Sequence, residues 1–107
     1  MHAPATKTMT LQQPVEQVFA AVVKTVEAGK YVPGEVDAGN FRIAFASGKT
    51  ALSWGNEYIA TVSAASGGTL LELECGGIDG APKALMDKWK NGKQAEKALA
   101  AIASNLS

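Results

Sequence analysis

The sequence predicts an α+β domain, a two-layer sandwich in which a curved antiparallel five-stranded sheet carries two helices on one face. Apolar residues recur at helical spacing near both ends of the chain, polarity alternates through the middle, and glycine-rich turns separate the alternating segments. The expected element order is β-α-β-β-β-β-α. Because two amphipathic helices need one apolar sheet face to cover, the other sheet face is expected to lack a cover.

Length and charge suit one small domain, which we expect to span residues 1–107 with an ordered core over about 6–106. Ten Lys and Arg balance ten Asp and Glu. This neutrality does not favour a whole-domain nucleic-acid or membrane partner. The first residues lack the apolar stretch of a secretory signal, and the run 18–23 is too short to span a bilayer, so we expect a cytoplasmic protein.

The N-terminal third predicts a strand, a helix and a second strand. Residues 6–11 alternate between threonines and larger side chains, which is typical of a short strand. Residues 15–26 place valines and Phe19 on one wide apolar stripe, which predicts a helix that lies on a core. Residues 31–37 predict a short irregular strand, because Pro33 lacks the backbone donor that a central strand needs.

The middle of the chain predicts three further strands. Turn residues at 37–40 precede an alternating segment at 41–46, and a longer segment follows at about 52–63. The turn at 65–68 then leads into a returning strand over 70–75. The glycine-rich segment after it predicts no regular element.

The last segment, 82–106, predicts the longest helix. Gly92 lies within its apolar stripe at a cost of about 1 kcal/mol of helix propensity relative to alanine, which indicates a close backbone crossing. Lys88 also falls inside the stripe, so its side chain must extend past the sheet edge or face a cavity. The apolar stripe comprises Leu85, Trp89, Gly92, Ala95, Leu99, Ile102, Ala103 and Leu106.

The charges divide unequally between this helix and the rest of the chain. Five lysines against two acidic residues give residues 82–107 a local charge of +3, so the preceding part carries −3. A solvated helix face explains these lysines better than weak attachment to phosphates or acidic partners does. The neutral molecule is therefore expected to be dipolar.

This element order resembles the repeat unit of TATA-box-binding-protein-like folds and the helix-grip folds, in which a curved antiparallel sheet wraps a long C-terminal helix. More narrowly, Ser53-Trp54-Gly55, the strand residues 58–62 and the run Asp87-Lys88-Trp89-Lys90 resemble an uncharacterised family of small bacterial domains. The family carries a Ser-Trp-Gly strand motif and a basic, glycine-containing final helix. The resemblance implies a fold and brings no activity, substrate or catalytic residue.

No catalytic, metal or cofactor site is predicted, and we expect a protein that is not an enzyme. The only histidine, His2, lies near the terminus, where it cannot be placed beside a nucleophile and an acid. One cysteine and one histidine also lack the spacing of metal ligands. Cys75 shares its strand parity with Leu71 and Leu73, which favours a buried core thiol over a reactive one.

The uncovered sheet face carries the first functional hypothesis, a module that binds a protein partner or a second copy of itself. DNA-binding sheets of this architecture present basic residues and apolar wedges, whereas this face is small, mildly apolar and slightly acidic, so nucleic acid is not the expected partner. Such a composition suits a covering chain better. Alternation places on this face Arg42, Ala44, Ala46, Ile59, Thr61, Leu70 and Glu72.

The alternative hypothesis is a small apolar ligand held in a pocket between the sheet and the final helix. Two tryptophans, the glycine at the helix crossing and the lysine within the apolar stripe motivate it. The expected lining residues are Trp54, Tyr58, Cys75, Lys88 and Trp89.

Overall fold

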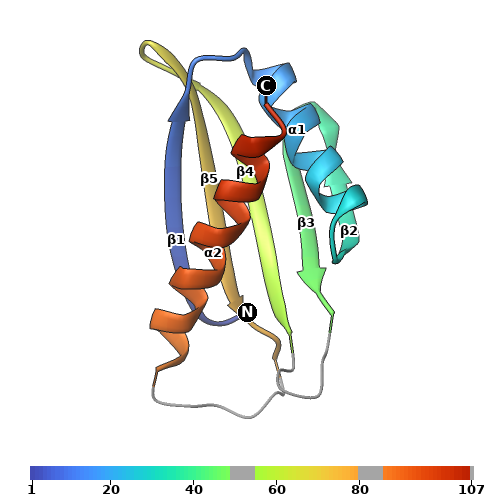
Figure 1. Cartoon of the computed structure of the whole chain (residues 1–107), viewed down its shortest axis with the longest axis vertical. Helices are drawn as coiled ribbons and strands as arrows, with labels where there is room; N and C mark the ends of the chain where they lie inside the picture. The colour runs from blue at the N-terminus through green and yellow to red at the C-terminus, as the bar shows by residue number, and fades with distance from the viewer. Residues whose placement is uncertain (49–54, 80–85, 107) are drawn as a thin grey trace.

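The computed structural model describes residues 1–48, 55–79 and 86–106, and in them five strands form one antiparallel sheet with two helices on one face (Figure 1). The strand order across the sheet is β1-β5-β4-β3-β2. The predicted fold class and element order are confirmed. The elements are β1 (His2–Leu11), α1 (Val15–Ala28), β2 (Tyr31–Asp37), the short 3-10 helix η1 (Ala38–Asn40), β3 (Arg42–Ser47), β4 (Asn56–Ala65), β5 (Gly68–Gly77) and α2 (Asp87–Ser104).

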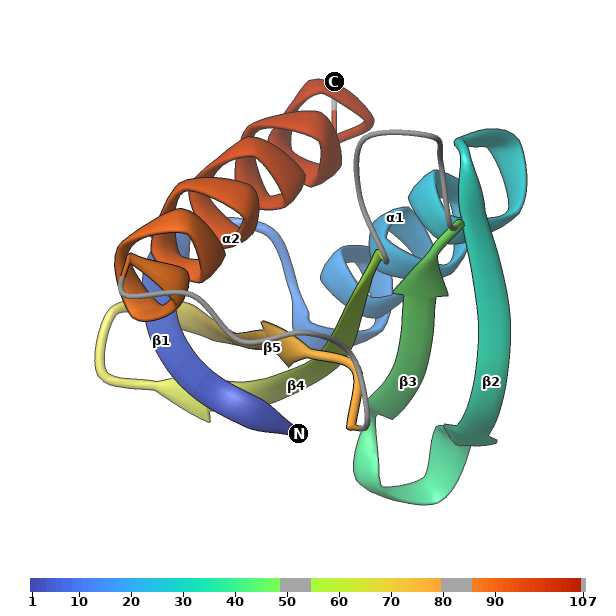
Figure 2. The same cartoon turned by 90° about the horizontal axis from the view of Figure 1, so that it is seen from below.

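The sheet curves around both helices, as Figure 2 shows from below. Helix α2 packs on β1 and β5, whereas α1 packs mainly on β2, β3 and β4. The two helices also meet where Asn105 Nδ2 donates a hydrogen bond to Thr25 Oγ1 at 2.8 Å. The concave face of the sheet is therefore the covered one.

The core lies between this concave face and the helices. Alternate residues of β3, β4 and β5 point inward, and the antiparallel register aligns them across the strands, with Phe45 opposite Tyr58 and Tyr58 opposite Cys75. Since side chains alternate between the two faces of a strand, this register sends their neighbours to the other face. The buried inner-face residues of these strands are Ile43, Phe45, Tyr58, Ala60, Val62, Leu71, Leu73 and Cys75.

Strands β1 and β5 are longer than the sequence predicts. β1 begins at His2 rather than at residue 6, and β5 continues to Gly77, over the first two glycines of the segment that predicted no regular element. His2 pairs with Gly77, so the two strands support each other there. A Cβ atom on Gly76 would collide with the Met1 side chain. Strand pairing and this close approach outweigh the weak local preference of glycine for a strand.

The helical wheel is wrong at the N-terminal end of α2. Trp89, predicted on the core, is 59% exposed, and Lys88 is exposed as well. Asn91 instead points to the sheet and is 4% exposed. Gly92 is buried as expected: an added Cβ there would lie 3.4 Å from Lys7 Cε and 3.7 Å from Ala5 Cβ, so α2 and β1 do cross closely.

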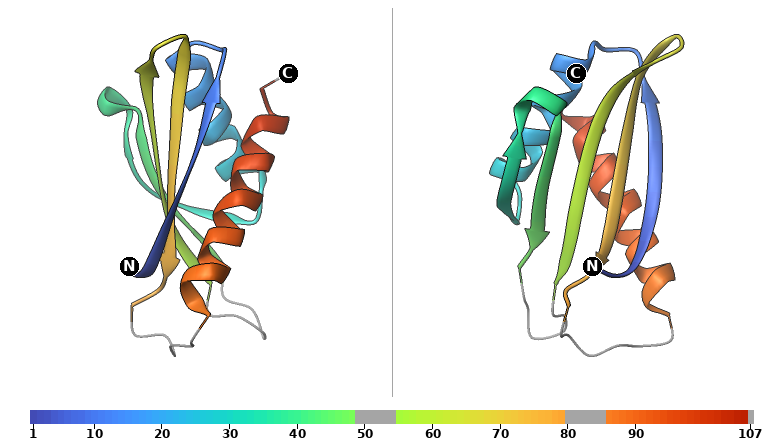
Figure 3. Two further views of the ribbon diagram at one scale, coloured as in Figure 1. Left: turned by 90° about the vertical axis from the view of Figure 1, so that its left-hand side faces the viewer. Right: turned by 180° about the vertical axis from the view of Figure 1, so that it is seen from behind.

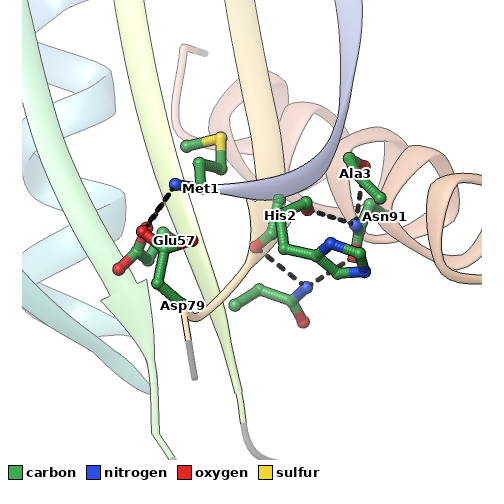
Figure 4. A network of polar contacts seen from close by, with 8 residues as sticks. Met1, His2, Ala3, Glu57, Asp79 and Asn91 are labelled. Atoms are coloured by element: carbon green, nitrogen blue, oxygen red, sulfur yellow. Dashed lines mark hydrogen bonds and ion pairs between the residues drawn. The ribbon is translucent and has the colours of Figure 1, made fainter. Parts of the chain in front are cut away.

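Asn91 fastens the start of α2 to the sheet through side-chain hydrogen bonds (Figure 4). Its Nδ2 donates to the carbonyl oxygens of Ala3 at 2.9 Å and His2 at 3.3 Å. Its Oδ1 accepts from Asn56 Nδ2 at 2.7 Å. Asn56 Nδ2 also donates to the Gly76 carbonyl oxygen at 3.3 Å. The side chains of Asn91 and Asn56 together therefore link α2 with β1, β4 and β5.

We expect Asn91→Ala to lower the free energy of unfolding by about 2–3 kcal/mol, because buried amide and carbonyl groups lose their partners. Urea unfolding followed by circular dichroism measures this loss. Gln94→Ala on the exposed side of the same helix is the matched control, with an expected change below about 0.5 kcal/mol. Equal stabilities of the two variants would contradict the assigned role of Asn91.

Candidate binding surfaces

The predicted interior pocket is only partly assembled by the structure. Tyr58 and Cys75 lie side by side on the inner face of β4 and β5 and are 2% and 0% exposed. Lys88 and Trp89 are exposed on α2 and do not lie with them. Trp54 lies outside the described residues. Two of the five predicted lining residues are thus brought together.

Aromatic rings occupy the space beside Cys75. Phe45 stacks on Tyr58 with a centroid distance of 4.8 Å and an interplanar angle of 5°. Tyr31 meets both rings edge-on, at 5.1 Å from Phe45 and 5.5 Å from Tyr58. These geometries are the favourable ones for aromatic pairs. A ligand bound here would have to displace packed rings.

Burial keeps the titratable groups of this cluster protonated. Desolvation raises the pKa of the Cys75 thiol to about 12, although a hydrogen bond with Tyr58 acts in the opposite direction. Desolvation is also the main reason that the pKa of Tyr58 lies above its usual value. A neutral thiol is a poor nucleophile. Cys75 is therefore a buried core residue, as the sequence favoured.

The second predicted surface lies where the sequence placed it, on the sheet face turned away from the helices. Figure 3 shows this face from behind, with the strands in front of both helices. We call it the outer face. Ala44 pairs with Ile59 across β3 and β4, and Thr61 pairs with Arg42 and with Glu72, so these side chains share one face. Ala46 and Leu70, the other predicted members, are half-buried like Ala44 and Ile59.

The outer face is hollowed on both sides of Arg42 and Ile59. One hollow of about 390 Å³ is lined by Glu35, Asp37, Arg42, Ala44 and Ile59. A second, of about 170 Å³, is lined by Thr6, Arg42, Ile59, Thr61, Glu72 and Glu74. A third, of about 380 Å³, adjoins Ala44 and Ile59 and is lined by Met1, Ala44, Phe45, Ala46, Glu57, Tyr58 and Ile59. The face thus combines an apolar centre with an acidic rim.

The amino group of Met1 lies at one end of this face (Figure 4). It is 3.0 Å from Asp79 Oδ2 and 3.8 Å from Glu57 Oε2. The hydrogen bond to Asp79 is the main reason that the pKa of this amino group is raised. Sequence reasoning missed this contact, because no local pattern signals that residues so distant in the chain will pair.

A third surface, a groove between α2 and β1, was not predicted. It has a volume of about 830 Å³, and Trp89 and Met86 are 59% and 54% exposed beside it. Lys93 Nζ lies 5.7 Å from the Trp89 ring centroid, and Lys7 and Lys93 approach Glu96 to 3.9 and 3.5 Å. We call it the α2–β1 groove. Its lining residues are Pro4, Ala5, Thr6, Lys7, Met86, Lys88, Trp89, Gly92, Lys93 and Glu96.

Comparisons with known proteins define the fold. No protein-family model and no curated protein matches the chain. The crystal structure of Ara h 8.0201 matches with a TM-score of 0.66 and 12% identity over 96% of each chain. A DUF4468 family protein from Bacteroides ovatus matches with a TM-score of 0.53 and 15% identity, over 97% of this chain and 85% of that one. The chain has a helix-grip-like α+β fold.

At 12% and 15% sequence identity, the similarity to these two structures concerns the fold alone and assigns no activity. In the part of the chain that the structure describes, no three His, Cys, Asp or Glu side chains gather as metal ligands would. Neither described helix is long and apolar enough to cross a membrane. The three surfaces therefore have to be judged by their own chemistry.

We expect the free energy of unfolding to fall as the pH rises from 9 toward 12, because the unfolded state releases the Cys75 proton while the folded state keeps it. This stabilising contribution is complete below pH 9, and its loss reaches about 1.4 kcal/mol per pH unit. Urea unfolding over this range measures it. Cys75→Ala should show a shallower decline, since the other titrating groups remain. Identical slopes would contradict the raised thiol pKa.

Proposed function

We propose that this domain is a non-enzymatic binding module that docks a partner on its outer face. The observation that carries the proposal is the placement of both helices on the concave face, which leaves Ala44 and Ile59 half-buried on a face that none of the described helices covers. Apolar patches rimmed by polar groups are typical of protein-binding surfaces. The buried, protonated Cys75 supports a function without covalent chemistry.

The charge of the outer face indicates the chemistry of the partner. Arg42 is the one basic side chain among the residues that line its three hollows. A complementary partner would present lysine or arginine around an apolar residue, whereas nucleic acid would be repelled. The acidic rim comprises Glu35, Asp37, Glu57, Glu72 and Glu74.

Self-association through this face remains part of the proposal, with one restriction. A symmetric homodimer that pairs the outer face with itself would bring two acidic rims together, which costs binding energy. A second copy would fit better through a lysine-bearing surface. We also propose that the chain belongs to the bacterial Ser-Trp-Gly family and lies in the cytoplasm. Ser53 and Trp54 of that motif lie outside the described residues.

An apolar ligand between the sheet and α2 is the second candidate function. The helix-grip-like fold and the adjacent Tyr58 and Cys75 favour it. The stacked ring of Phe45 opposes it, since a ligand would have to separate rings that now pack at 4.8 Å. A ligand of this kind should shift the resonances of all three residues. Shifts confined to exposed residues would exclude the interior site.

We expect a ten-residue peptide of alternating lysine and valine to shift amide resonances around Ile59 and Ala44 in NMR titrations at low salt. Ile59→Thr, which keeps the β-branched shape but removes apolar surface, should raise the dissociation constant of the peptide at least fivefold, which is a loss of about 1 kcal/mol of binding free energy. Ala100→Thr, on the exposed side of α2, should not change it.

Two results would contradict the proposed docking surface. One is the absence of shifts at peptide concentrations of about 1 mM. The other is binding that spreads over all carboxylates and is equally strong in Ile59→Thr, because that would be diffuse charge attraction without an apolar centre.

A further inference from the structure

The large apolar side chains that are exposed in the described part of the chain gather at two places. Val32 and Val36 are 57% and 50% exposed on β2, which forms one edge of the sheet. Met86 and Trp89 are 54% and 59% exposed at the start of α2, beside β1, which forms the opposite edge. Figures 1 and 2 show the two places on opposite sides of the molecule.

The two places carry opposite charge. On β2, Glu35 and Asp37 precede and follow the exposed Val36 in the sequence. The two carboxylates line an outer-face hollow with Arg42, so they outnumber the one basic side chain there. The α2–β1 groove presents three lysines against the single carboxylate of Glu96. An acidic strand with an exposed valine thus has the composition that complements a basic groove with an exposed tryptophan and methionine.

The groove is open enough to receive a strand edge. Its walls are the edge strand β1 and the first turns of α2, and its volume is about 830 Å³. Gly92 contributes no side chain, and Lys7 extends across it, with Lys7 Nζ 3.9 Å from the position that a Cβ would take. The exposure of Trp89 and Met86 shows that these side chains are not enclosed. An extended segment suits this shape better than a small molecule, which proteins usually enclose.

We propose that the β2 edge of one copy docks into the α2–β1 groove of a second copy. Val36 contacts Trp89, and Glu35 lies near Lys88 of the other molecule. The contact is made by side chains, because Pro33 and the shift in register between Pro33 and Val36 interrupt β2 as a template for a regular ladder. The zero net charge of the chain does not oppose association.

This contact is heterologous, so it has a consequence for the assembly. Each copy uses its groove for one neighbour and its β2 edge for another, and the product is a ring or an open chain rather than a symmetric dimer. The inference goes beyond the proposed function: it shares Glu35 with the outer face, but it does not need Ile59.

Sedimentation velocity of the full chain over a concentration series up to about 1 mM at low salt tests the proposal. We expect the average mass to rise above the 11.1 kDa of the monomer and the association to weaken as salt is added. Lys88→Glu should weaken self-association about tenfold. Lys90→Glu makes the same charge change on the same helix outside the groove lining and should have little effect.

A charge exchange provides the decisive arm of the experiment. Glu35→Lys alone should also weaken self-association, and the double variant Lys88→Glu, Glu35→Lys should restore it. A strict monomer at about 1 mM, equal effects of Lys88→Glu and Lys90→Glu, or no rescue in the double variant would overturn the inference. Self-association that is lost in Ile59→Thr but kept in Lys88→Glu would also overturn it while supporting the outer face.

Discussion

The alignment of large apolar side chains on one face of β3, β4 and β5 is the constraint on which the rest of the structure depends. Phe45, Tyr58 and Cys75 stand in one row across these strands, and the neighbouring row of Ile43, Ala60 and Leu73 is equally buried. Because all of this surface faces one way, both helices have to lie on it. The opposite face, with Ala44 and Ile59, then lies outside the core.

The architecture could largely be predicted from the sequence. The alternation of apolar and polar residues in strands and the helical spacing of apolar residues both reflect which side chains are buried, so they do not depend on small differences in local propensity. The strand Tyr31–Asp37 and the hairpin turn after Ala65 have the predicted positions. The misjudged places are those where distant residues decide. β1 extends to His2 because His2 pairs with Gly77, and no local sequence pattern predicts a partner so distant in the chain.

The errors at α2 have a single physical cause. A helical wheel assigns the buried side of a helix from the positions of its apolar residues, and it therefore placed Trp89 rather than Asn91 on the core. The structure gives the inward position to Asn91, because carbonyl groups at the irregular start of β1 need donors that an apolar side chain cannot supply. The displaced Trp89 then faces solvent beside Lys93 and helps to form the α2–β1 groove. The inward position of Asn91 and the exposed position of Trp89 are thus linked, because the two residues lie on one turn of α2.

The central claim is that one sheet face belongs to the core while the described helices leave the other face accessible. Thiol labelling of Ala44→Cys in a Cys75→Ala background tests it directly, with the parent protein as the buried reference. We predict that the introduced thiol reacts within about tenfold of an unhindered cysteine, whereas Cys75 in the folded parent reacts far more slowly. Equal resistance of both thiols to labelling would contradict the account.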